Sequence, residues 1–211
     1  MPISPLAPAR NSRSIPLPKH DLPADTDALA RALIGWRLVH ATAEGVASGR
    51  IVETEAYLLG DPASHAFRGE RPRTRVMFGP PFHAYVYRIY GRYWCFNVTS
   101  EVLGTGAGVL VRALEPEDGL ALMRERRGVE AERLLCSGPS RLAQALAIDG
   151  THDGADLFAD GPLRLVPSLR PAGKIGRSRR IGITHAAAAR RLLRYYERGS
   201  PWLSGPKRLS P

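Results

Sequence analysis

Ile51-Val-Glu-Thr-Glu-Ala-Tyr57 is the stretch that organises the rest of the chain, because its pattern predicts a strand carrying two carboxylates and an aromatic ring. Side chains of a strand alternate between its two faces. Four residues are therefore expected on one face: Ile51, Glu53, Glu55 and Tyr57. An acid beside a ring favours chemistry on a flat group, although a solvated surface position is the commoner role of any single glutamate.

The flanking sequence predicts neighbouring strands with helices around them. Asp25 or Thr26 can cap a helix that ends at Gly35. We expect strands over residues 36–41, 47–57, 84–89, 93–98, 107–114, 164–167 and 181–183, and further helices over 116–126, 139–148 and 185–196. This order favours an α+β fold: a single mixed domain with a curved, largely antiparallel β-sheet, flanking helices and a protruding β-hairpin.

Length and composition predict one folded domain with a tail at each end. The 211 residues suffice for one domain with an ordinary core. Residues 1–20 hold five prolines and are expected to form a disordered, basic, proline-rich tail. The domain is expected over residues 21–205, with a C-terminal tail over 206–211.

The charge of the chain favours a polyanionic partner. Lys and Arg number 30 against 20 Asp and Glu, a net charge of +10. All but Lys19, Lys174 and Lys207 are arginines, whose planar guanidinium grips phosphate at two points. Nucleic acid is the first candidate, an anionic membrane surface is the second, and a solvated basic surface is the remaining alternative. Codon usage explains the preference for arginine over lysine equally well.

Metal, cofactor and membrane functions are disfavoured. Cys95 and Cys136 form no Cys-x-x-Cys pair, and the six histidines lack metal-ligand spacing. The sequence has no apolar run near ~20 residues, no signal-peptide core and no phosphate-binding glycine loop. We expect a cytoplasmic monomer, nucleoid-associated in a bacterium, that uses no metal and no cofactor.

Aromatic and basic residues gather in the middle of the chain. The segment 85–94 holds five rings in ten positions, most of them explained by cross-strand pairing in a core. Tyr90, beside Gly91 at a predicted hairpin tip, is instead a candidate wedge between base steps. Six arginines surround this set: Arg68, Arg71, Arg73, Arg75, Arg88 and Arg92. Rings with arginines supply the stacking surfaces and phosphate ligands that nucleic acid binding needs.

Nine motifs follow one another along the chain: Val52-Glu-Thr-Glu-Ala-Tyr57, His65-Ala-Phe-Arg-Gly69, Arg73-Thr-Arg-Val-Met-Phe78, Tyr85-Val-Tyr-Arg-Ile-Tyr-Gly91, Cys95-Phe-Asn-Val98, Leu110-Val-Arg-Ala-Leu-Glu-Pro116, Cys136-Ser-Gly-Pro-Ser-Arg-Leu142, Arg180-Ile-Gly-Ile183 and Arg198-Gly-Ser-Pro-Trp202. In this order they resemble the 3-methyladenine DNA glycosylase family of the alkyladenine (methylpurine) type. The resemblance runs from about residue 22 to 204.

The resemblance implies a role for particular residues. Glu55 would activate water against the anomeric carbon, and Arg112 would position that water with backbone near Ile181. The implied base pocket contains Tyr57, His65, Tyr87, Asn97 and Ile181, where Asn97 crowds the 2-amino group of guanine. Tyr90 would be the DNA wedge, and the DNA backbone would be held by Arg68, Arg73, Arg75 and Arg92.

The implied activity is that of a monofunctional DNA glycosylase of base excision repair. Such an enzyme flips alkylated or deaminated purines out of double-stranded DNA, at a cost of a few kcal/mol, and hydrolyses the N-glycosidic bond. Bond cleavage develops oxocarbenium character that an anionic Glu55 would stabilise. Positively charged alkylated purines would gain a cation–π interaction with the pocket rings. Without a nearby lysine amine, no lyase activity is expected.

Two departures from the family pattern and two competing functions remain open. Glu70 and Phe82 stand where glycines are usual, in loops expected to border the pocket, so the substrate range is in doubt. The main alternative is a non-catalytic binder of distorted or damaged duplex DNA. A more remote alternative is an RNA-modifying or nucleotide-transfer enzyme.

Overall fold

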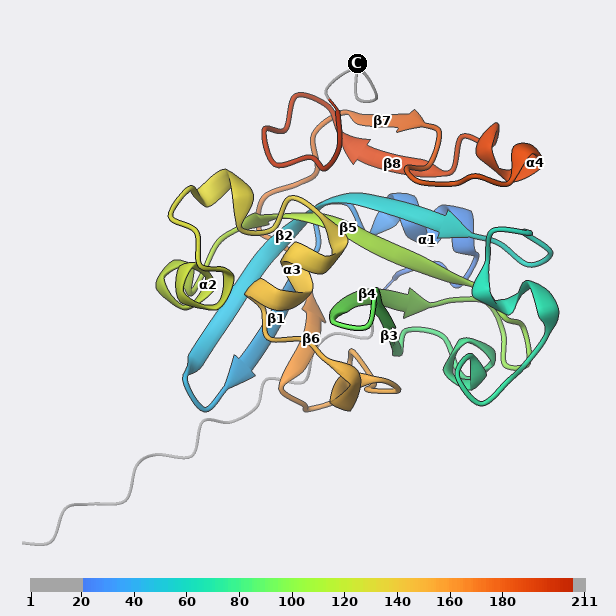
Figure 1. Cartoon of the computed structure of the whole chain (residues 1–211), viewed down its shortest axis with the longest axis horizontal. Helices are drawn as coiled ribbons and strands as arrows, with labels where there is room; N and C mark the ends of the chain where they lie inside the picture. The colour runs from blue at the N-terminus through green and yellow to red at the C-terminus, as the bar shows by residue number, and fades with distance from the viewer. Residues whose placement is uncertain (1–20, 207–211) are drawn as a thin grey trace, which may run out of the picture.

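Eight strands form one curved, antiparallel sheet in the computed structural model, which describes residues 21–206 (Figure 1). The strands are β1 (Arg37–Thr42), β2 (Gly45–Tyr57), β3 (Ala84–Ile89), β4 (Tyr93–Thr99), β5 (Gly108–Pro116), β6 (Leu163–Val166), β7 (Ile175–Ser178) and β8 (Arg194–Glu197). The helices are α1 (Thr26–Ala32), α2 (Leu120–Arg127), α3 (Pro139–Ala145) and α4 (Ala186–Ala189), with short 3-10 turns between. The predicted tails lie outside the described residues except for Pro206.

Strand β2 is the longest element and the centre of the sheet. The strand order is β3-β4-β5-β2-β1-β6, with β8 added to the C-terminal half of β2 and β7 paired with β8. The first half of β2 therefore pairs with β1, and its last residues lie between β5 and β8. This placement buries nearly every residue of β2, including both carboxylates.

A β-bulge at Glu53 bends β2 against β5, because the strand register shifts on both sides of this residue. The strict alternation predicted from Ile51 is therefore interrupted. Beyond the bulge it holds: Glu53 and Glu55 both approach Arg112, whereas the hydroxyl of Thr54 donates to a carbonyl of α1. Bulges re-aim side chains and are frequent beside active sites.

Helices cover both faces of the sheet. In Figure 1, α1 lies behind the sheet and α2 and α3 lie in front of it. As predicted, Asp25 caps α1, its carboxylate accepting from the backbone N–H of Ala28 at 2.8 Å. The main core joins buried side chains of α1, the central strands and α3, such as Leu29, Phe96 and Leu142.

The C-terminal third differs from its prediction. The helix predicted over 185–196 is wrong, because only Ala186–Ala189 is helical and Arg194–Glu197 forms β8. Pairing of β8 with both β2 and β7 outweighs the helix propensity of Ala and Arg. The strand predicted over 181–183 is a turn, and the sequence pattern did not indicate β7.

The helix predicted to begin at Pro116 begins instead at Leu120. Pro116 is the last residue of β5 and pairs with Gly49, a position at the strand end that a proline tolerates. The predicted α+β class, with an antiparallel sheet and a projecting β3–β4 hairpin, is confirmed. Within residues 21–206, none of the helices has the length and apolarity needed to cross a membrane.

Candidate active site

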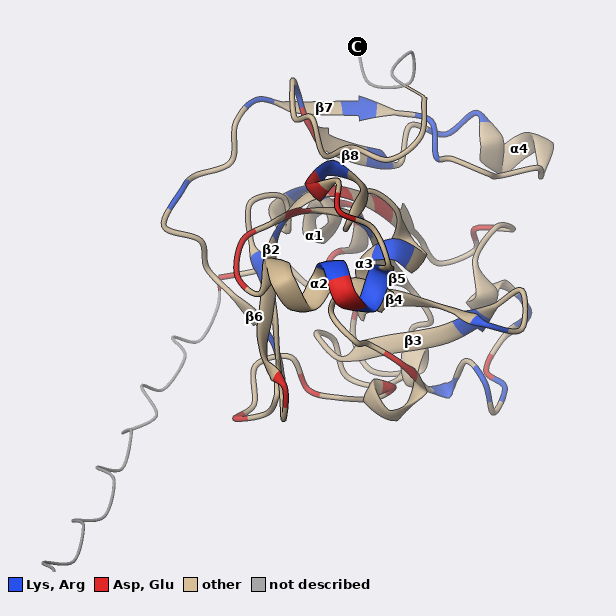
Figure 2. Cartoon of the chain, turned by 60° about the vertical axis from the view of Figure 1, so that its left-hand side comes forward, with Lys and Arg blue, Asp and Glu red and all other residues tan. Residues whose placement is uncertain are grey.

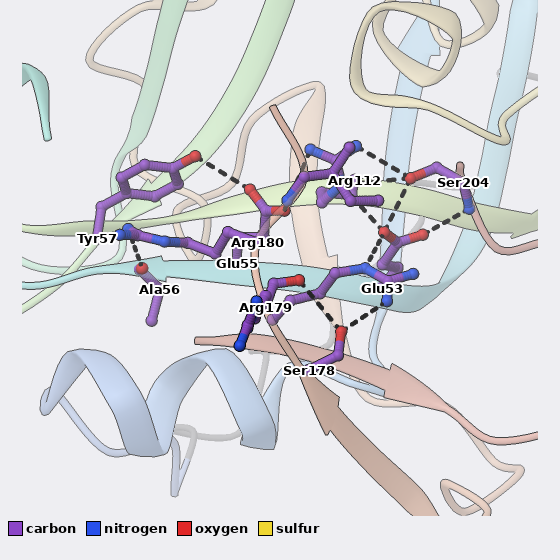
Figure 3. Close-up of polar contacts among 11 residues, drawn as sticks. Glu53, Glu55, Ala56, Tyr57, Arg112, Ser178, Arg179, Arg180 and Ser204 are labelled. Carbon is purple, nitrogen blue, oxygen red and sulfur yellow. Dashed lines mark hydrogen bonds and ion pairs between the residues drawn. The ribbon is translucent and has the colours of Figure 1, made fainter. Parts of the chain in front are cut away.

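Glu55 is fully buried near the C-terminal end of β2 and is held by three donors (Figure 3). Its Oε1 accepts from the backbone N–H of Ile181 at 2.7 Å and lies 3.3 Å from Nη1 of Arg112. Its Oε2 accepts from the hydroxyl of Tyr57 at 3.0 Å. A carboxylate anchored from three directions keeps one orientation, which a general base requires.

Burial is the largest influence on the acidity of Glu55. It raises the pKa of this carboxyl above its ordinary value, and the neighbouring charge of Arg112 and the N–H of Ile181 offset only part of that effect. Burial likewise raises the pKa of the Tyr57 phenol, which therefore stays protonated and donates to Glu55. A carboxylate with a raised pKa is a stronger proton acceptor than one on the surface.

Glu53 is the structural partner of Arg112. Its Oε1 accepts from Nε of Arg112 at 3.0 Å, from Nε of Arg194 at 2.7 Å and from the hydroxyl of Ser204 at 2.8 Å, and its Oε2 accepts from the N–H of Ser204 at 2.6 Å. Ser204 Oγ in turn lies 3.1 Å from Nη2 of Arg112. These contacts fix the guanidinium, so that Nη1 points at Glu55.

An aromatic cavity of about 150 Å³ is linked to Glu55 through Tyr57, which lines the cavity and donates to Glu55, whereas the buried Glu55 is not itself among the lining residues. Its wall includes four of the predicted pocket residues, Tyr57, His65, Tyr87 and Asn97. The rings of His65 and Tyr87 have centroids 4.4 Å apart, and the amide of Asn97 donates to the carbonyl of Tyr85 at 3.0 Å. Burial, with a smaller contribution from Arg73, lowers the pKa of His65, so the imidazole is neutral at pH 7. The cavity therefore offers flat, largely uncharged walls.

The remaining predicted pocket residue, Ile181, does not line this cavity and instead contributes its backbone N–H to Glu55. Glu70 and Phe82 do not line it either. Glu70 is exposed, and Phe82 packs its ring against Phe158, with centroids 5.9 Å apart, at the main core. Phe82 has φ of +66°, the left-handed conformation that favours glycine, so this departure affects the backbone more directly than the pocket.

Tyr90 occupies the tip of the β3–β4 hairpin with 88 % of its surface exposed. Tyr90 and Gly91 both have positive φ, as a type I′ turn requires, and Arg92 N–H donates to the carbonyl of Ile89 at 3.2 Å. A tyrosine is unfavourable in this conformation, and strain of this kind is concentrated at functional positions.

The four predicted backbone-binding residues are all exposed: Arg68, Arg73, Arg75 and Arg92. Figure 2 shows basic residues on this hairpin and the loop beside it.

The sequence did not single out Glu53, Arg194 and Ser204 as parts of the site. Glu53 carried one signal, its predicted place on the face of Glu55, but its partners lie 141 and 151 residues away and show no pattern that links them to it. Within residues 21–206, no cluster of three His, Cys, Asp or Glu side chains could hold a metal ion.

Comparisons with known proteins identify the family of this chain. The family model described as methylpurine-DNA glycosylase matches residues 20–201. A protein of Mesorhizobium japonicum is 56% identical to this chain, and the match covers 92% of each. A protein of Nitrosospira multiformis is 48% identical over 92% of this chain and 97% of its own. A protein of Methanoculleus marisnigri is 50% identical over 85% of this chain and 94% of its own. All three carry the name "Putative 3-methyladenine DNA glycosylase". The chain belongs to the methylpurine-DNA glycosylase family, whose members are hydrolases that act on N-glycosyl bonds.

Proposed function

We propose that this protein is a monofunctional glycosylase of base excision repair that flips alkylated or deaminated purines from double-stranded DNA and releases them with a water activated by Glu55. Family membership supplies the enzyme class and leaves the non-catalytic binder without support. The observation that carries the finer proposal is a buried carboxylate with a raised pKa, joined through one hydrogen bond to a wall of an aromatic cavity.

The contacts of Glu55 suggest where the water binds. Oε1 already has two donors, Ile181 N–H and Arg112 Nη1, whereas Oε2 accepts only from Tyr57 among the described residues. A carboxylate oxygen has two lone pairs, so Oε2 keeps capacity for one more donor. A water there would deliver its oxygen to the anomeric carbon as its proton passes to Glu55, and the anion would stabilise the developing oxocarbenium charge.

The cavity walls support recognition of a flipped base. Stacking of a base on aromatic side chains contributes about 1–3 kcal/mol. Asn97 is fixed by its bond to the carbonyl of Tyr85, which suits a residue that crowds the 2-amino group of normal guanine. Tyr90, exposed at the hairpin tip, would fill the space that the base leaves, and the nearby arginines would hold phosphates.

Three finer features belong to the same proposal. No lyase activity is expected, because strand cleavage through a Schiff base needs an amine at the site and Lys174 lies on the β7 side of the molecule. We propose that the protein acts as a monomer on cellular DNA, which gel filtration of the free and DNA-bound protein tests. DNA affinity should fall steeply with rising salt.

A single-turnover assay tests the reaction. Duplexes that each carry one hypoxanthine, 1,N6-ethenoadenine or 3-methyladenine are incubated with excess protein and then treated with alkali to cut abasic sites. We expect base release by wild type and a loss of at least about 100-fold in Glu55→Gln, within the range that general base catalysis contributes. Glu44→Gln, an exposed glutamate on another part of the molecule, is the matched control. Release of no base by wild type, or equal rates for wild type and Glu55→Gln, would contradict the proposal.

A further inference from the structure

Arg180 is a buried cation behind one wall of the base cavity. Its side chain is fully buried, and its guanidinium carbon lies 4.5 Å from the centre of the Tyr57 ring. Figure 3 shows this side chain beneath the ring, reaching the carbonyl of Ala56, to which Nη1 donates at 2.9 Å. Nη1 also lies 2.6 Å from the carboxylate of Asp61.

The guanidinium contacts the face of Tyr57 that is turned away from the cavity. The cavity is open to solvent and Arg180 is not among its lining residues, whereas Tyr57 is. A ring has two faces, so a purine in the cavity and the buried guanidinium would occupy opposite ones. Nε and Nη2 of Arg180 have no hydrogen-bond partner among the described residues. The contact with the Tyr57 ring is therefore what compensates the positive charge at these two nitrogens.

We propose that Arg180 is a specificity-determining residue that makes the cavity prefer neutral damaged purines over positively charged ones; this inference rests on the proposed glycosylase function. A ring attracts cations through the negative charge of its faces. A cation already held on one face withdraws that charge and repels a second cation on the other face. A neutral deaminated purine still stacks on the ring, whereas a cationic N-alkylated purine loses the attraction that an unoccupied tyrosine would supply.

The surroundings of the ring favour the same preference. The ion pair of Arg180 with Asp61 has its positive end against the ring, because the carboxylate meets the guanidinium edge at Nη1. On the cavity side, burial lowers the pKa of His65, so that wall supplies no charge at pH 7. Glu55 attracts a cation, but the nearby Arg112 opposes that attraction.

The test compares excision of two bases by charge variants. Single-turnover rates are measured on duplexes carrying 7-methylguanine, which is cationic, or hypoxanthine, which is neutral. Arg180→Met should raise the ratio of the cationic to the neutral rate constant about five- to tenfold, the factor of one cation–π interaction. Arg180→Lys keeps the charge and should restore the wild-type ratio. Arg191→Met is the matched control, because Arg191 lies 3.8 Å from the same Asp61 carboxylate without contacting the ring.

A second variant and a second readout make the test decisive. Arg180→Met combined with Asp61→Asn removes both buried charges and should show the same change of ratio if the single variant does not fold. The binding affinities of the two duplexes are also measured for Glu55→Gln and for the double variant Glu55→Gln/Arg180→Met. Without the proposed general base, these affinities report the preference between the two bases independently of base release. A ratio within twofold of wild type in every Arg180 variant would overturn the inference. Failure of wild type to release either base would instead refute the glycosylase proposal, and the affinity ratios would still decide the role of Arg180.

Discussion

Replacing Tyr90 by asparagine should make the protein more stable and less active. Tyr90 has φ of +49° and its ring is 88 % exposed, so the substitution relieves backbone strain and removes almost no burial. The left-handed conformation costs an ordinary residue about 1–2 kcal/mol, and asparagine tolerates it. The substitution also places an asparagine directly before Gly91, and Asn-Gly is the dipeptide that type I′ turns favour most.

We expect the free energy of unfolding to rise by about 1 kcal/mol, which for a chain of this size raises Tm by about 2–4 °C. Calorimetry and urea titration measure this change. In the excision assay the same variant should lose more activity on paired duplex than on single strands, because only the duplex needs the base stack to be refilled.

Two other variants separate strain from contact. Tyr90→Val keeps an apolar residue but adds a branch that the left-handed conformation disfavours, so it should melt below wild type. Phe82→Asn relieves the same kind of strain at φ of +66° but removes a ring packed on Phe158, and it should lose about 2 kcal/mol or more. If Tyr90→Asn melts at or below wild type, the strain argument is incorrect.

Three further predictions concern the buried acids. Because the folded pKa of Glu55 is raised above its ordinary value of 4.5, the native protein loses stability as pH rises from that ordinary value to the folded pKa. The Tm of Glu55→Gln should therefore gain on that of wild type as pH rises above 4.5, and a constant difference would contradict this. The single-turnover rate of base release should rise with pH over the same titration, since only the anion accepts a proton; a falling rate would refute the assignment. Ser204→Ala should lower the free energy of unfolding by about 1–3 kcal/mol in urea, because it removes a hydroxyl that bonds Glu53 and Arg112, and an unchanged value would show that these bonds add nothing.

The sequence predicted those elements that depend on residues close to one another in the chain, such as helix caps and tight turns. The cap of Asp25 and the turn residues after β3 each act within a few positions, and each appears in the structure. The segment 185–196 has the composition of a helix, yet its last residues pair with β2 and β7. The pairing with β2 depends on a partner more than a hundred residues away, which no local pattern contains.

The candidate site divides in the same way. The motifs that resemble the glycosylase family include Tyr57, His65, Tyr87 and Asn97, and these residues do line one cavity. Their roles in catalysis stay predictions. The support around Glu53 could not be predicted, because Arg194 and Ser204 join it only through the tertiary fold. The bulge that interrupts alternation at Glu53 likewise has no sequence signature here.

The contacts of Glu53 and Glu55 also set the order in which the site can be assembled. Ile181, Arg194 and Ser204 all come from the last part of the described chain, and each reaches a carboxylate of β2. While the chain is being synthesised, β2 therefore exists for some 120 residues of elongation without the groups that orient its acids. In the proposed enzyme, the two acids are therefore oriented only when the last part of the chain is in place, so that activity would require completion of the fold.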